Sequence, residues 1–194
     1  KISKSISAVL LPEISYGNEK SSFNHSLNSF VFIIPFFILI IFPFLDKLLV
    51  FWLQDQYSEK ILELTKIFLI VSWISGISHI LITFFEGKKK IKFNTIIEIY
   101  FLFPFLLTLF YVLIKFESLI FISFILLFKE CMLMLFRSNK IRKNIYKLHS
   151  IYLNIIIVII NLVINMYYNQ YFLYSFIILI LFNSFLIIKM RSRK

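Results

Sequence analysis

Residues Leu64–Ile114, LTKIFLIVSWISGISHILITFFEGKKKIKFNTIIEIYFLFPFLLTLFYVLI, decide the fold, because two long apolar runs meet there at a turn rich in lysine. An α-helix needs roughly 20 residues to cross the hydrocarbon core of a bilayer, and each run is close to that length. The strands of a membrane barrel would be shorter, about 10 residues, and would alternate apolar with polar positions. The stretch therefore predicts two antiparallel membrane helices joined by a short polar turn.

The composition of the whole chain agrees with this prediction. Of its 194 residues, 60% are hydrophobic and 16% are charged, whereas soluble domains have about 45–50% apolar and 25% charged residues. Cys131 is the only cysteine, which excludes an intrachain disulfide. The net charge of +11 would suggest a polyanionic partner in a soluble protein, but the basic residues here gather in short connections between apolar runs. We therefore predict an all-α polytopic integral membrane protein that binds no nucleic acid.

Six apolar runs predict a bundle of six transmembrane helices. The expected spans are 30–53, 64–85, 93–114, 119–136, 151–168 and 171–188. Residues 1–28 are expected to hold the end of an earlier helix, stopped at Pro12, and a cytoplasmic loop. Residues 29–137 then form four transmembrane helices, 138–148 a basic cytoplasmic loop, and 149–194 two additional helices with a basic tail. On this organisation the chain begins inside a longer protein.

The distribution of lysine and arginine predicts the orientation of the spans, since these residues are retained on the cytoplasmic side. Alternate connections are basic: Lys20, the turn Lys88–Lys92, the loop RSNKIRKNIYKLH at 137–149, and the tail 189–194. The connections between them carry little more than Lys60 and Lys115. Both ends of the chain are therefore expected to be cytoplasmic. Gly87 is expected to end the second helix in the way that glycine does after a helix C-terminus.

Two ionisable residues inside the predicted spans are candidate site residues. Placing such a group within a bilayer costs about 2.5–3.5 kcal/mol, so each requires a reason to be there. Glu98 and Lys129 would lie at similar depth on antiparallel neighbours, so an ion pair between them is geometrically reasonable. Two interpretations stay open: a charged element of a cavity, or a structural pair whose side chains reach the cytoplasmic interface.

His79 is the third candidate. It lies on one helical face with Ser72, Gly76 and Thr83, at spacings of i, i+4, i+7 and i+11. Small and hydroxyl residues on one face allow a neighbouring helix to approach closely, so helix packing explains the stripe. The alternative is the wall of a cavity in which His79 carries a proton, for which an ordinary pKa of about 6.5 is suitable.

Motifs of soluble enzymes are absent from the sequence. It contains no glycine-rich phosphate loop, no zinc-ligand cluster and no Ser, His and Asp constellation. We therefore predict no catalytic residues, no cofactor, no metal and no enzymatic activity.

Four stretches in order carry a family resemblance: AVLLPEIS (8–15), LLVFWLQDQYSEKILELTKIFLI (48–70), WISGISHILITFFEGKKKIKFN (73–94) and the pair of helices that follows. Together they cover most of residues 6–137. In this layout the chain resembles the oligosaccharide flippases of polysaccharide biosynthesis, such as O-antigen repeat-unit transporters, within the MATE-like superfamily. The resemblance implies the second lobe of a two-lobed transporter plus two extra helices.

The resemblance also implies a function. Such a transporter moves polyprenyl-pyrophosphate-linked oligosaccharide units across a bacterial cytoplasmic (inner) membrane by alternating access. Its expected partners are that lipid-linked substrate, membrane lipids, the missing N-terminal lobe and other polysaccharide assembly proteins. In this role Lys129 would attract the pyrophosphate and Glu98 would titrate in the coupling cycle. The alternatives are a multidrug or small-molecule exporter of the same superfamily, and a membrane enzyme similar to O-antigen polymerases.

Overall fold

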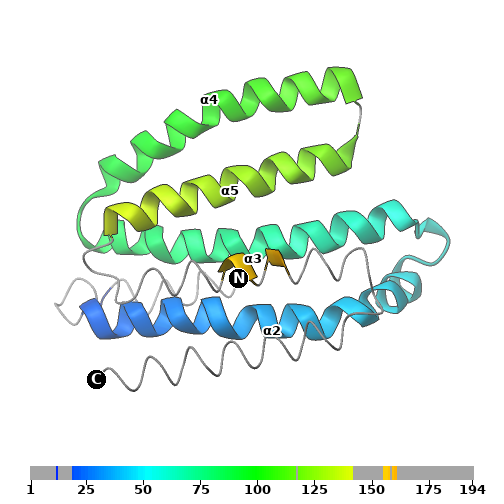
Figure 1. Ribbon diagram of the computed structural model, residues 1–194, viewed down its shortest axis with the longest axis horizontal. Coiled ribbons are helices and arrows are strands. Elements are labelled where there is room, and N and C mark those ends of the chain that lie inside the picture. Colours follow the sequence, from blue (N-terminus) through cyan, green and yellow to red (C-terminus); the bar gives the residue numbers. More distant parts are fainter. Residues whose placement is uncertain (1–11, 13–18, 117, 142–154, 158, 161–194) are drawn as a thin grey trace. The chain divides into compact units, whose positions relative to one another are not determined.

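The computed structural model describes residues 12, 19–116, 118–141, 155–157 and 159–160 (Figure 1). Its elements are α2 (Glu19–Leu53), the 3-10 turn η1 (Gln54–Gln56), α3 (Glu59–Gly87), α4 (Ile91–Phe116) and α5 (Leu119–Ile141). The described part of the chain contains no strand, so the predicted all-α class is confirmed there. Among these described residues, four helices are long and apolar enough to cross a membrane. The fifth and sixth predicted spans fall almost entirely outside the described residues.

Two helices are longer than their apolar runs. Residues 19–28, which we expected in a loop, form the first turns of α2. They are helical because Phe23 and Leu27 continue the buried face of Phe30 at i, i+4 and i+7 spacing. Likewise α5 continues to Ile141, beyond the predicted end at 136 and into the expected basic loop, because its last turns also bury one face.

Local hydrogen bonds mark both ends of α3. At its start the Ser58 hydroxyl accepts a hydrogen bond from the backbone N–H of Ile61 at 3.4 Å, as an N-cap does. At its end, Lys90 N–H donates to the carbonyl of Phe85 at 2.8 Å and Lys89 N–H donates to that of Glu86 at 2.9 Å, which is the Schellman pattern.

The residue that turns the chain after α3 is Lys89, with φ at 56°. Gly87 is the last helical residue, so α3 ends where we expected but Gly87 does not adopt the turning conformation. Lysine tolerates the left-handed region here because the turn satisfies two carbonyls that the helix end would otherwise leave without partners.

Backbone contacts divide the chain into a first unit, residues 1–30 with 67–146, and a second unit, residues 31–66 with 147–194. Within the first unit α4 and α5 lie side by side and antiparallel (Figure 1). The Phe23 and Phe84 rings are 4.6 Å apart, and Lys140 Nζ lies 5.3 Å from the ring centre of Phe93. The start of α2, the turn after α3 and the end of α5 therefore share one end of this unit. Among the described residues, Lys88, which lies 6.0 Å from the Phe84 ring centre, and Lys140 are both at that end. The side of the membrane stays a prediction.

The exposed apolar surface of the first unit is clearest on α4. Phe103, Phe110 and Ile114 recur at i, i+7 and i+11, and each is about two-thirds exposed. An apolar face of this width needs an apolar environment, which a bilayer provides.

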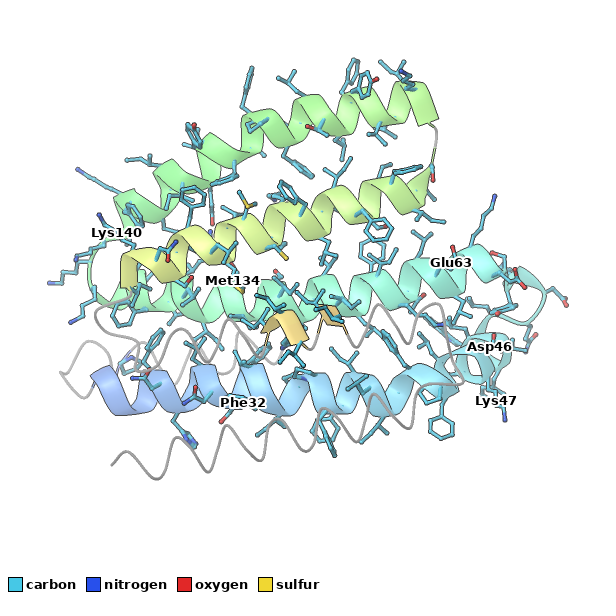
Figure 2. All side chains as sticks on the ribbon, viewed as in Figure 1. Phe32, Asp46, Lys47, Glu63, Met134 and Lys140 are labelled. Carbon is cyan, nitrogen blue, oxygen red and sulfur yellow. The ribbon has the colours of Figure 1, made fainter. Side chains whose placement is uncertain are left out.

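In the second unit the Tyr57 hydroxyl donates a hydrogen bond to Asp46 Oδ1. Asp46 and Lys47 lie near the end of α2, as Figure 2 shows. The bond to the Asp46 carboxylate raises the pKa of Tyr57, which lies outside the spans, to about 12. Protonated tyrosine is the bonded form, so folding stabilises it.

We expect the stabilising effect of this bond to be lost as the pH rises. The ordinary pKa of tyrosine is 10.0 and the folded-state value is about 12, so the contribution is complete below pH 10 and disappears as the pH passes the folded value. Tyrosinate absorbance during alkaline titration measures it. Tyr57→Phe should remove a component that titrates near pH 12, and Asp46→Asn should move that component toward pH 10. An unchanged high-pH component in Tyr57→Phe would contradict the assignment.

Candidate functional site

A pocket of about 800 Å³ lies between α3, α4 and α5 in the first unit. All three residues predicted from the sequence, His79, Glu98 and Lys129, line it. Each comes from a different helix. The other lining residues are mostly small, hydroxyl-bearing or aliphatic, with two further charges: Val71, Ser72, Ser75, Gly76, Ser78, Ile82, Thr95, Ile99, Leu102, Glu130, Leu133 and Arg137. The pocket is therefore a polar surface within three apolar helices.

Arg137 of α5 makes the densest set of polar contacts at this pocket. Its Nε donates to Asn94 Oδ1 at 2.8 Å, its Nη1 donates to Ser78 Oγ, and its Nη2 donates to Glu98 Oε1 at 2.6 Å. Asn94 Nδ2 also donates to Glu98 Oε1, at 3.3 Å. We call these four residues the Arg137 clasp. It joins α3, α4 and α5 through side chains alone.

Burial makes the clasp energetically important. The Arg137 side chain is 2% exposed, whereas Glu98 is 49% exposed. A buried guanidinium without a counter-charge is strongly unfavourable, and the rigid fork of arginine suits binding to several acceptors at once. Met134, labelled in Figure 2, and Leu133 are buried beside Arg137 on α5. Glu98 therefore supplies the compensating charge, and Ser78 and Asn94 occupy the other nitrogens.

The ion pair between Glu98 and Lys129 that the sequence made geometrically reasonable does not form. Glu98 binds Arg137, and Lys129 Nζ lies 3.8 Å from Glu130 Oε1 and 4.8 Å from the ring centre of Phe105. The prediction assumed that Arg137 belonged to the cytoplasmic interface. Because α5 continues past it, Arg137 is buried and reaches Glu98 instead.

The stripe that contains His79 serves two purposes. Ser75 and His79 line the pocket and are partly exposed, so this part of the stripe is a cavity wall. Gly76 is buried against Phe30 of α2, whose ring would overlap a Cβ atom at that position. Thr83 donates its hydroxyl to the His79 carbonyl at 3.0 Å and is buried. Both interpretations of the stripe therefore apply: His79 and the neighbouring Ser75 belong to the cavity wall, Thr83 to the packed part, and Gly76 to both.

The charges around the pocket are balanced. Arg137 is paired with Glu98, and Lys129 lies near Glu130. Lys129 nevertheless makes no hydrogen bond to another described residue, and its side chain is 25% exposed. The ammonium group therefore retains donors that a ligand can use. Within the described part of the chain no three His, Cys, Asp or Glu side chains are grouped to hold a metal ion.

Sequence reasoning missed Arg137 as a site residue because it was counted with the basic loop. The signal was present, since Glu130, Leu133 and Arg137 follow one another at i, i+3 and i+7 and therefore share a helical face. Sequence reasoning also did not single out Lys66 of α3 as a buried charged residue. Lys66 belongs to the second unit, outside the pocket, and is 6% exposed.

Comparisons of the chain with protein-family models, with curated proteins and with solved structures found no match.

Proposed function

We propose that the chain is part of a membrane transporter whose substrate site includes the pocket between α3, α4 and α5. The observation that carries the proposal is the gathering of His79, Glu98 and Lys129 at one pocket within helices long and apolar enough to span a membrane. Ionisable groups inside a membrane bundle are costly, and they characteristically mark substrate or ion pathways.

We further propose that the substrate is a polyprenyl-pyrophosphate-linked oligosaccharide, moved across the cytoplasmic membrane of a bacterium. The layout that resembles oligosaccharide flippases supports this substrate class. The pocket adds chemical support: hydroxyl groups of Ser72, Ser75 and Thr95 and paired charges suit the hydroxyls of a sugar. Among the described residues that line the pocket, Lys129 is the cation that donates no hydrogen bond, and it attracts a phosphate as a point charge. Glu98 and His79 are the groups that could exchange protons during transport.

Replacing Lys129 by Ala tests the proposal. A hydrogen bond to a charged group contributes about 1.5–3 kcal/mol, so transport should fall at least about tenfold. The measurement is the distribution of lipid-linked intermediates in cells that depend on the protein for surface polysaccharide. Trapped units on the cytoplasmic side are expected. Lys115→Ala is the matched control, since Lys115 lies on α4 outside the pocket lining and bonds the hydroxyl of Tyr111 at 3.0 Å.

Two results would contradict this function. Unchanged transport by Lys129→Ala at normal membrane levels would remove Lys129 from the substrate path. Loss of the protein that leaves single units exported but not joined would favour the polymerase alternative, because loss of a flippase would keep the units on the cytoplasmic side.

A further inference from the structure

The Arg137 clasp lies at one end of the pocket. Asn94 is in the first turn of α4, directly after the basic turn that follows α3. The pocket extends away from there as far as Val71 on α3, Leu102 on α4 and Lys129 on α5, and on α3 one lining residue, Ile82, lies beyond Ser78 toward the turn. The clasp therefore lies between most of the pocket and the end of the first unit that carries the basic turn.

Two layers close this end of the pocket. In the first, the buried side chains of Arg137, Ser78 and Asn94 fill the space between three helices. In the second, aromatic rings pack between the clasp and the turn: Phe85 and Phe93 are 5.0 Å apart, and Phe84 is buried beside them. Among the described residues, a ligand moving from the pocket toward the basic turn between the three helices would meet both layers.

The clasp is built so that it can open. All its bonds join side chains, so breaking them leaves the backbone hydrogen bonds of the helices intact. Its only carboxylate, Glu98, is half exposed and lines the pocket, where a ligand can reach it. Glu98 both lines the pocket and belongs to the clasp. A ligand that binds Glu98 therefore competes with Arg137 for it, which couples occupancy of the pocket to opening of the clasp.

We propose that the Arg137 clasp is the gate that closes the pocket toward the basic turn, with Arg137 and Glu98 as positioning residues that hold α3, α4 and α5 together. This inference rests on the proposed transport function. It assigns Glu98 to control of access, which is separate from binding of the substrate by Lys129.

Thiol accessibility tests the gate independently of transport. The full chain carries Cys131→Ala, so that Ser75→Cys places the single thiol in the pocket. A membrane-impermeant thiol reagent is applied to sealed vesicles from one side at a time. A separate Lys89→Cys preparation identifies the side of the basic turn. With the clasp intact, labelling of position 75 from that side should be slow.

Glu98→Gln should raise the labelling rate from the turn side about tenfold, because the clasp loses a charge-assisted hydrogen bond. Ser78→Ala, a milder change, should raise it less. The charge swap Glu98→Arg with Arg137→Glu should return the rate toward that of the parent, which a merely structural disturbance would not do. Lys92→Gln is the matched control, since Lys92 is exposed in the first turn of α4, at the same end of the unit, and belongs neither to the clasp nor to the aromatic layer.

The outcomes separate the gate from the proposed function. A labelling rate unchanged in both Glu98→Gln and Ser78→Ala, or raised only from the opposite side, would overturn the gate whatever happens to transport. If the rates change as expected while Lys129→Ala leaves transport normal, the gate stands and the assigned substrate path fails. Should Glu98→Gln not reach the membrane, Ser78→Ala and the charge swap decide the result.

Discussion

Glu98→Ala is expected to lower the free energy of unfolding by about 3 kcal/mol, because it leaves the buried Arg137 charge without a counter-charge. Removing one partner of a fully buried ion pair costs about 3–5 kcal/mol. The lower end applies here, since Glu98 is 49% exposed and water in the pocket can reach the vacated position. Urea unfolding of the purified protein in detergent micelles measures the change.

Replacing the other partner of the ion pair, Arg137, should lower the free energy of unfolding by less. Arg137→Met fills a similar volume with apolar atoms and leaves Glu98 free to be hydrated, so the remaining cost comes from the lost partners of Ser78 and Asn94. The double variant Glu98→Ala with Arg137→Met has no buried charge and should therefore be more stable than Glu98→Ala alone. The order of stability among these variants is a stronger test than the free energy of unfolding of any one of them.

Glu130→Ala is the matched control for this prediction. Its partner Lys129 is partly exposed and 3.8 Å away, so the loss should not exceed about 1 kcal/mol. Equal effects of Glu98→Ala and Glu130→Ala would show that the Arg137 charge is not held by Glu98.

Gly76→Leu is expected to destabilise the first unit by about 3 kcal/mol through overpacking. Leucine is a good helix former, so the effect isolates packing from helix propensity. A Cβ atom at position 76 would overlap the Phe30 ring, which is 6% exposed. The ring cannot move freely, because Trp73 Nε1 donates to the backbone carbonyl of Phe30 at 3.1 Å and fixes that part of α2.

A second substitution identifies the cause. Phe30→Ala removes the ring, so Gly76→Leu combined with Phe30→Ala should cost less than the sum of the two single changes. Ser72→Leu is the control on α3: Ser72 is exposed, one turn away from Gly76, and should change stability by no more than about 1 kcal/mol. Additive costs for Gly76 and Phe30 would exclude their contact as the source of the effect.

The helices could be predicted from the sequence because apolar length is a direct requirement of the bilayer. Their ends could not be predicted from hydropathy, since polar residues extend a helix wherever one face stays buried. Phe23 and Leu27 show this at the start of α2, and Ile141 shows it at the end of α5. A search for i, i+4 and i+7 apolar spacing beyond each run would have recovered both extensions.

Three of the residues that line the candidate pocket could be selected from the sequence, whereas Arg137 and the pairings between the charges could not. An ionisable group in a span marks a position of interest, and this reasoning selected His79, Glu98 and Lys129. The partner of Glu98 depends on which helices pack together and on the length of α5, neither of which hydropathy contains. The distribution of charges along the chain placed Arg137 in a loop. The sequence alone does not distinguish a cation in the last turns of a helix from a cation in the loop that follows.

The two tryptophans give the molecule a spectroscopic readout for each unit. Trp73 of the first unit is 1% exposed and hydrogen-bonded, and Trp52 of the second unit is 78% exposed. Since indole emission shifts with the polarity around the ring, Trp52→Phe and Trp73→Phe each leave one reporter. Unfolding of the two units can then be followed separately by intrinsic fluorescence, without an attached dye.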